Sequence, residues 1–164
     1  MNRRSMLALS TTALLCLGAF SNAQADETLK FRAIMHATSV QSQDIGDVDG
    51  HTAGVARFSG LASFPDGTVG TSYFVAATDY TKGAGTFSVY QNLTLNDGSV
   101  LWFKTAGTAT VDGATTLLKG TITVLGGKGR FEGAKGEGTV NGIRLTPLAA
   151  GAELYNDIAI NIKK

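Results

Sequence analysis

The sequence predicts an all-β protein: an eight-stranded antiparallel up-and-down barrel of the calycin-like type, preceded by an export signal. Three observations predict the barrel. After residue 25 the chain has no long helical pattern and consists of short runs rich in Val, Ile, Thr, Phe and Tyr. Turn signals separate these runs at intervals of about 8–15 residues, which is typical of β-hairpins. Eight antiparallel strands in succession can close into a barrel without exposed edges, and a two-sheet sandwich is the alternative.

The first 25 residues have the three regions of a cleavable secretory signal. Arg3 and Arg4 make the start positive, an apolar stretch follows from Met6 to Phe20, and the small-residue pattern Ala23-Gln24-Ala25 ends the segment. The apolar stretch is shorter than the roughly 20 residues that a membrane-spanning helix needs. We therefore expect cleavage after Ala25, a periplasmic or secreted protein, and no membrane attachment after cleavage.

Cleavage leaves a single domain, residues 26–164, with a distinctive composition. Cys16 and two of the 14 Lys and Arg residues lie in the signal, so the domain has no cysteine and carries 12 basic against 13 acidic side chains. Without cysteine it has no disulfide, no thiol nucleophile and no thiolate metal site. Its near-neutral charge argues against nucleic acid as a partner. About 139 residues are enough to bury a core without further cross-links.

The strands are expected between turn signals in which Gly, Asn or Asp tolerates positive φ. These signals are Asp49-Gly50, Pro65-Asp66-Gly67, Lys82-Gly83, Asn96-Asp97-Gly98 and Asp112-Gly113. Between and beyond them, the eight expected strands are 28–41, 52–64, 68–80, 84–95, 99–111, 115–125, 135–146 and 152–163.

Alternation of apolar and polar residues indicates which strand face is buried. In the fourth strand Val89 and Leu93 share one face, and in the last strand Ile158 and Ile160 do the same. Other strands are apolar on both faces, as in Val100-Leu101-Trp102-Phe103. Two-sided apolar strands indicate that the outer surface is also covered, so we expect a homo-oligomer.

The most distinctive stretch is the glycine-rich segment 120–138. It is not a phosphate-binding loop, because Gly129 follows Lys128 where that loop needs Ser or Thr, and no helix pattern comes after it. We interpret it as a structural turn, in which three glycines reverse the chain, a phenylalanine plugs the barrel end and a last glycine precedes the next strand. These residues are Gly126, Gly127, Gly129, Phe131 and Gly133.

The order strand, Gly-Gly-x-Gly-x-Phe-x-Gly-Ala-x-Gly, strand, over residues 121–136, resembles the signature of the allene oxide cyclase and dirigent-protein superfamily. The resemblance implies a bacterial exported member: an eight-stranded barrel, commonly trimeric, with a hydrophobic cavity for a small organic ligand. In the plant members that cavity steers a reactive intermediate without any cofactor, so none is expected here. No catalytic residue is carried over, because the first strand lacks the Glu and Pro of the plant cyclase motif.

Neither polar cluster in the sequence has the spacing of a metal site. The run from Asp44 to Gly50 places Ile45 and Ala56 where a helix-flanked calcium loop needs Asp and Glu, which favours a polar turn. His36 and His51 are the two histidines, and no third zinc ligand accompanies them. We therefore expect no metal.

Two amides interrupt otherwise apolar strand faces and are the candidate site residues. Gln91 does so in the fourth strand and Asn156 in the last. A buried amide costs about 1–3 kcal/mol unless it is hydrogen-bonded. One hypothesis is that both amides orient a ligand in the cavity, with Tyr73 as a third contact. The other is that they bond one another, a water molecule or a neighbouring backbone group.

Three functional hypotheses follow. The leading one is an exported, homo-oligomeric barrel that binds a small hydrophobic molecule, with a trimer implied by the family resemblance. The second is a cofactor-free cyclase or isomerase, whose cavity fixes the substrate while polar groups polarise it. The third is a structural or interaction protein with a filled barrel. An open apolar pocket would favour the first two hypotheses, and a packed interior would favour the third.

Overall fold

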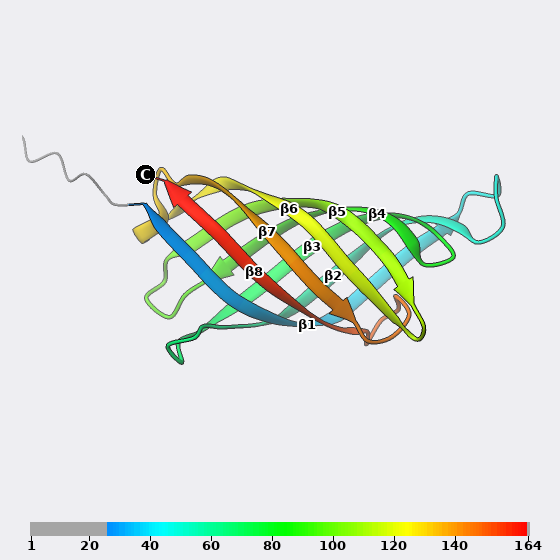
Figure 1. The fold of residues 1–164 in the computed structure, drawn as a ribbon, viewed down its shortest axis with the longest axis horizontal. Coiled ribbons are helices and arrows are strands. Elements are labelled where there is room, and N and C mark those ends of the chain that lie inside the picture. The colour runs from blue at the N-terminus through cyan, green and yellow to red at the C-terminus, as the bar shows by residue number, and fades with distance from the viewer. Residues whose placement is uncertain (1–25, 164) are drawn as a thin grey trace, which may run out of the picture.

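The computed structural model describes residues 26–163, which form a closed antiparallel barrel (Figure 1). Consecutive strands pair throughout, and the last strand closes the barrel on the first, from Glu27 opposite Ile162 to His36 opposite Glu153. The barrel is confirmed over the sandwich. Its strands are β1 (Glu27–Asp44), β2 (His51–Ser63), β3 (Val69–Thr81), β4 (Ala84–Thr94), β5 (Val100–Asp112), β6 (Thr115–Lys128), β7 (Lys135–Arg144) and β8 (Glu153–Lys163).

All eight expected strands are present, and the largest differences lie at the ends of β1 and β6. Both strands continue three residues past their expected ends. In β1 the ladder with β2 runs on to Asp44 opposite Thr52. In β6 the ladder with β5 skips Leu125 as a bulge and continues to Lys128. The hairpin that joins β1 and β2 extends furthest from the barrel body (Figure 1).

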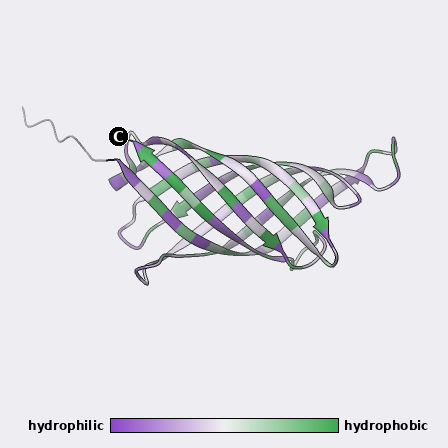
Figure 2. Ribbon diagram, in the orientation of Figure 1, coloured by the Kyte–Doolittle hydropathy of each residue, from purple (hydrophilic) through white to green (hydrophobic). Residues whose placement is uncertain are grey.

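Apolar and polar residues alternate along the strands (Figure 2), and the alternation places the buried, mainly apolar residues on the inner face. In β4, Val89 and Leu93 are buried and Tyr90 between them is exposed. In β8, Ile158 and Ile160 are buried, as the sequence predicts. The inward faces therefore supply one continuous hydrophobic core.

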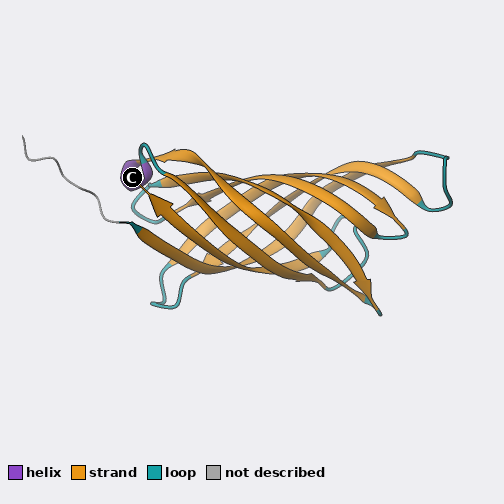
Figure 3. Cartoon of the chain, turned by 45° about the horizontal axis from the view of Figure 1, so that its top comes forward, coloured by secondary structure: helices purple, strands orange, loops and turns teal. Residues whose placement is uncertain are grey.

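The barrel end near Glu27 and the carboxyl terminus is closed by packed side chains. The short 3-10 helix η1 (Gly129–Phe131) lies at this end (Figure 3). Phe131 is fully buried there, at the position where the sequence predicts a plug. Phe103 and Leu101 from β5 are also completely buried, so this half of the interior is filled.

The glycine-rich turn differs in detail from the expectation. Gly126 and Gly127 do not reverse the chain; they lie within β6, opposite Trp102 and Leu101 of β5. The reversal comes later, where Gly129 and Gly133 have φ of 64° and 72°, a conformation that glycine adopts without steric cost. The bulge in β6 accounts for the difference, because it lets the strand pairing continue past the first two glycines.

At the opposite end, the loop 145–152 is fixed against β1. The backbone amide of Ala37 donates to the carbonyl of Ala152, and that of Gly151 donates to the carbonyl of Ala37, both at 2.9 Å. The β1 ladder shifts register at Thr38, next to these bonds. Leu148 in this loop packs against the core, so the loop partly covers the barrel end.

Two sequence-based expectations concern the ends of the chain and its membrane contacts. The expected signal, residues 1–25 with its cleavage site at Ala25, lies outside the described residues. Within residues 26–163, no helix has the length and hydropathy to cross a membrane.

Candidate functional site: a cavity inside the barrel

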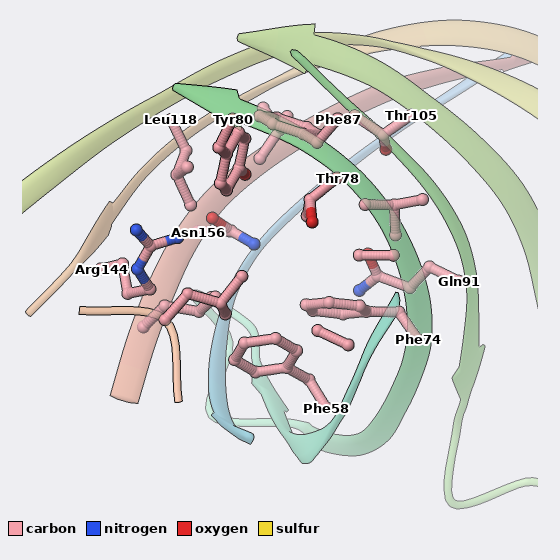
Figure 4. Close-up of a pocket in the computed structure, with 16 residues that line it drawn as sticks. Phe58, Phe74, Thr78, Tyr80, Phe87, Gln91, Thr105, Leu118, Arg144 and Asn156 are labelled. Atoms are coloured by element: carbon pink, nitrogen blue, oxygen red, sulfur yellow. The ribbon is translucent and has the colours of Figure 1, made fainter. Parts of the chain in front are cut away.

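A small cavity of about 50 Å³ lies in the half of the barrel away from the η1 plug. Sixteen residues line it (Figure 4), and most of the wall is apolar. The rings of Phe58 and Phe74 stack at one side, with centroids 4.6 Å apart. Ala56 and Ala76 neighbour these rings on the inward face of β2 and β3, where their short side chains leave the space open. The polar lining residues are Thr78, Tyr80, Gln91, Thr105, Arg144 and Asn156.

Gln91 reaches this cavity from β4, but its amide is already used within the protein. The side chain is 6% exposed. Its Nε2 donates to the Ser72 hydroxyl at 2.8 Å, and that hydroxyl donates to the Asn92 carbonyl at 3.1 Å. Gln91 is therefore part of a short polar chain that links β3 and β4, and its partner is a side-chain hydroxyl rather than Asn156 or a backbone group.

Asn156 projects into the same cavity from β8, and its amide is not fully used. The residue is 8% exposed, and its Oδ1 is buried without a hydrogen-bond partner among the described residues. No hydrogen bond joins it to Gln91 within residues 26–163. An orphaned buried carbonyl costs about 1–3 kcal/mol. The unpartnered Oδ1 packs against Gly142 on the neighbouring strand, so a ligand that used it would have to turn the Asn156 amide toward the cavity.

Arg144 at the end of β7 lines the cavity and is a candidate residue that the sequence-based hypotheses missed. It is 3% exposed. Its Nε donates to the Thr146 carbonyl and its Nη2 to the Thr116 hydroxyl, each at 3.0 Å. The sequence did contain a signal for it: Arg144 comes four residues after Val140, and residues separated by an even number along a strand lie on the same face. An arginine on the inward face of a barrel strand is uncommon enough to mark a site.

Arg144 and Asn156 belong to neighbouring strands and lie near one another at the cavity wall. The ladder pairs Arg144 with Leu154, and Gly142 with Asn156, so the two polar side chains are diagonal neighbours on the inner face (Figure 4). The Tyr80 ring completes this polar side of the cavity, with its centroid 5.9 Å from Cζ of Arg144.

The Tyr80 hydroxyl stays protonated at neutral pH. Burial raises the pKa of Tyr80 above its ordinary value, and the nearby Arg144 guanidinium opposes that shift. Because the net pKa is raised from 10.0, the phenol keeps its proton and can donate a hydrogen bond.

Tyr73, the third expected ligand contact, does not lie in the cavity. It is 38% exposed on the outer face of β3. Its neighbours Ser72 and Phe74 are the buried residues of this segment, so the alternation along the strand turns Tyr73 outward. We correct that expectation: two of the three candidate residues share the cavity, and Tyr73 does not.

A wider, open cavity of about 560 Å³ lies at the mouth of the barrel, beyond the inner one. The two cavities share Thr78, Tyr80, Arg144 and Leu148, so these residues stand between the mouth and the interior. The charged side chains that line the mouth are Arg144 and Lys82. Lys82 is largely exposed and pairs with Asp49 at 3.0 Å, which leaves Arg144 as the buried cation of the passage.

The polar turn at residues 44–50 uses its carboxylates in local contacts. Asp44 accepts a hydrogen bond from the Gly46 amide at 2.9 Å. His51 bonds Asp47 through Nδ1 and Asp79 through Nε2, and these carboxylates raise the pKa of His51. Among residues 26–163, no three His, Cys, Asp or Glu side chains are placed to hold a metal ion. His36 lies elsewhere, on the outer surface against Glu153.

Comparison with known proteins gives the fold. No protein-family model and no curated protein matches the chain. Among solved structures, the pterocarpan synthase dirigent protein GePTS1 is similar at TM-score 0.54 and 14% identity, over 95% of this chain and 98% of that one. The pterocarpan synthase dirigent protein PsPTS1 is similar at TM-score 0.55 and 14% identity, over 87% and 99%. The fold is a dirigent-like barrel.

A third solved structure, a pyocyanin demethylase, has a TM-score of 0.45 and 19% identity, over 80% of this chain and 99% of that one. That score is too low to support an argument. At 14% identity the similarity to the two dirigent proteins shows the fold of this chain. Its function has to be argued from its own residues.

Proposed function

We propose that this protein is an exported barrel that binds a small, mainly apolar molecule in its interior. The observation that carries the proposal is the largely apolar cavity into which Tyr80, Arg144 and Asn156 bring polar groups. A few polar groups that converge in an apolar pocket are the usual mark of a ligand site. The dirigent-like fold of the two pterocarpan synthase neighbours supports the same proposal.

The size of the cavity bears on where such a molecule lies. The inner cavity of about 50 Å³ holds only a few atoms, whereas ligand pockets usually measure about 300–1,000 Å³. The mouth, at about 560 Å³, is large enough for a small molecule. We propose that the ligand fills the mouth and extends past Tyr80 and Leu148 into the interior.

A calorimetric titration tests the proposal, with octanamide as a neutral, mainly apolar probe. The protein is expressed from the full chain. In the variant Ala76→Phe the new ring fills the inner cavity, because Ala76 lies on its wall. The matched control Ala77→Phe places the same ring on the exposed face of the same strand.

We expect the wild type and Ala77→Phe to bind octanamide with similar affinity, and Ala76→Phe to bind it roughly tenfold or more weakly. The absence of saturable binding to the wild type, or equal binding by Ala76→Phe, would contradict the proposal. The first of those results would favour the alternative of a structural protein with a filled barrel.

The proposal that the protein is exported rests on the sequence pattern of residues 1–25. All eight strands lie within Glu27–Lys163, so the barrel begins immediately after the proposed cleavage site at Ala25. Expression of the full chain in a Gram-negative host, followed by fractionation and amino-terminal sequencing, tests this. We expect a periplasmic or secreted protein that starts at Asp26. An uncleaved protein in the cytoplasm would contradict export.

We also propose self-association, because apolar side chains gather on the outside of β1 to β5. Ile34 lies opposite Leu61, and both are more than half exposed. Tyr73 on β3, Tyr90 on β4 and Trp102 on β5 are also exposed, at 38%, 58% and 42%. Faces of this kind are commonly buried between subunits.

Native mass spectrometry should give an oligomer, a trimer by the family resemblance. Trp102→Lys should dissociate it, whereas Val48→Lys in the exposed hairpin should not.

A cofactor-free cyclase or isomerase remains the alternative function. Arg144, Tyr80 and Asn156 are grouped in a largely apolar cavity, where polar groups interact strongly with a bound molecule. The two functions differ in the fate of the ligand. Mass spectrometry of the ligand before and after incubation separates them, because a binding protein returns the molecule unchanged and an isomerase returns a product.

A further inference from the structure

Arg144 is a buried cation without a carboxylate partner in the described part of the chain. Its side chain contacts a backbone carbonyl and a hydroxyl, and within residues 26–163 no Asp or Glu oxygen lies within 4 Å of it. The other arginines with ion pairs lie at the surface: Arg32 pairs with Asp157 and Arg130 pairs with Glu27. Burial of a charge is costly unless an opposite charge compensates it.

The neutral partners of Arg144 use only part of its donor capacity. Guanidinium has five N–H donors, and the Thr146 carbonyl and the Thr116 hydroxyl accept two of them. Tyr80 places its ring near the guanidinium and brings no negative charge, because its phenol stays protonated. The cation therefore keeps donors for a further acceptor.

The position of Arg144 indicates that a ligand in the cavities would supply this acceptor. The residue lines both the inner cavity and the mouth, so a ligand that reaches from one into the other lies close to its side chain. No acidic residue lines either cavity. An anionic group in this passage would meet one buried cation and no repelling charge.

From this arrangement we infer that the ligand carries a single carboxylate, which pairs with Arg144 between the mouth and the interior. The inference rests on the proposed function. A carboxylate matches the planar fork of guanidinium and brings one negative charge to one cation. A phosphate would bring up to two charges to the same passage, where Lys82 is already paired with Asp49. Most of the apolar part of the ligand lies in the mouth, against Val40, Val111 and Leu148, and only a few atoms reach the inner cavity.

A titration with octanoate and octanamide tests the inference, because these probes have the same length and differ in charge. The variants are Arg144→Met, which removes the buried charge at similar volume, and Arg57→Met, which removes an exposed charge from the outer face of β2. Arg144→Lys keeps the positive charge but loses the paired N–H donors with which guanidinium binds both oxygens of a carboxylate. Circular dichroism verifies that each variant folds.

We expect the wild type to bind octanoate roughly tenfold or more tightly than octanamide at neutral pH. Arg144→Met should bind both probes with similar affinity, Arg144→Lys should keep part of the preference, and Arg57→Met should keep all of it. If Arg144→Met does not fold, Arg144→Lys takes its place: a reduced preference for octanoate in that variant supports the inference, and an unchanged preference overturns it.

The possible failures are distinguishable. Equal binding of octanoate and octanamide by the wild type would overturn the inference about the carboxylate and leave the proposed function in place. A preference for octanoate that survives in Arg144→Met would also overturn it, because the charge would then be recognised elsewhere. Binding of neither probe would overturn both the inference and the proposed function.

Discussion

The side chain of Asn156 lies directly over the α-carbon of Gly142 on the neighbouring strand. The β7–β8 ladder pairs the two residues, and a Cβ at position 142 would come within 1.9 Å of Asn156 Oδ1. The same Cβ would meet the Tyr155 carbonyl at 2.8 Å. The absence of a side chain at Gly142 thus gives the Asn156 amide its place at the cavity wall.

The first prediction concerns this contact. Gly142→Ala forces the Asn156 side chain and the adjacent backbone to shift, so we expect a loss of about 1–3 kcal/mol in the free energy of unfolding. We also expect weaker binding of octanamide. Urea denaturation and calorimetry measure the two effects. If Gly142→Ala matched the wild type in both measurements, the placement of Asn156 described above would be wrong.

The second prediction separates a ligand-binding amide from a structural one. Asn156→Leu removes an unpartnered buried carbonyl at similar volume, so we expect the free energy of unfolding to rise by about 1 kcal/mol while octanamide binding weakens. The control Asn141→Leu lies on the exposed face of β7 and should change stability by less than about 0.5 kcal/mol. A marked loss of stability in Asn156→Leu would mean that the amide is structural.

The third prediction concerns the plug at the closed end. Phe131→Ala removes a fully buried ring, so we expect a loss of about 3–5 kcal/mol in the free energy of unfolding. Chemical denaturation measures it. The control Leu125→Ala removes a side chain that is 47% exposed at the β6 bulge and should have a much smaller effect. Similar effects for both variants would argue against a plug.

The fourth prediction concerns pH. Asp79 and Asp47 raise the pKa of His51 above 6.5 in the folded state, so the protonated form is favoured by folding. This stabilisation is fully present below pH 6.5 and is lost as the pH rises through the raised folded-state pKa. We expect NMR to place the His51 titration above 6.5. The stability advantage of the wild type over His51→Gln should shrink from about pH 5.5 to pH 8. An advantage that grows with pH would contradict the described contacts.

The sequence predicted the barrel well because local signals determine it. Turn residues such as Asp97, whose carboxylate accepts a hydrogen bond from the Ser99 amide, define the hairpins. Alternation within the strands defines the inner face, which placed Gln91 and Asn156 in the cavity. The ends of β1 and β6 were missed because pairing with neighbouring strands, rather than local preference, extends them.

The site was harder to predict because it depends on contacts between distant segments. The bond between Gln91 and Ser72 depends on the register of β3 and β4, and the sequence does not reveal it. Tyr73 was placed inside because its strand is apolar on both faces, so composition alone did not separate inside from outside. Arg144 was overlooked although strand parity places it inward, because an arginine is ordinarily expected at the surface.

A crystal structure of the protein grown with octanoate tests the central claim most directly. We predict electron density for octanoate in the passage between mouth and interior, with its carboxylate within hydrogen-bond distance of Arg144 and its chain against the apolar lining. Octanoate bound only on the outer face, or an interior without it and Arg144 bonded only to Thr146 and Thr116, would contradict the account.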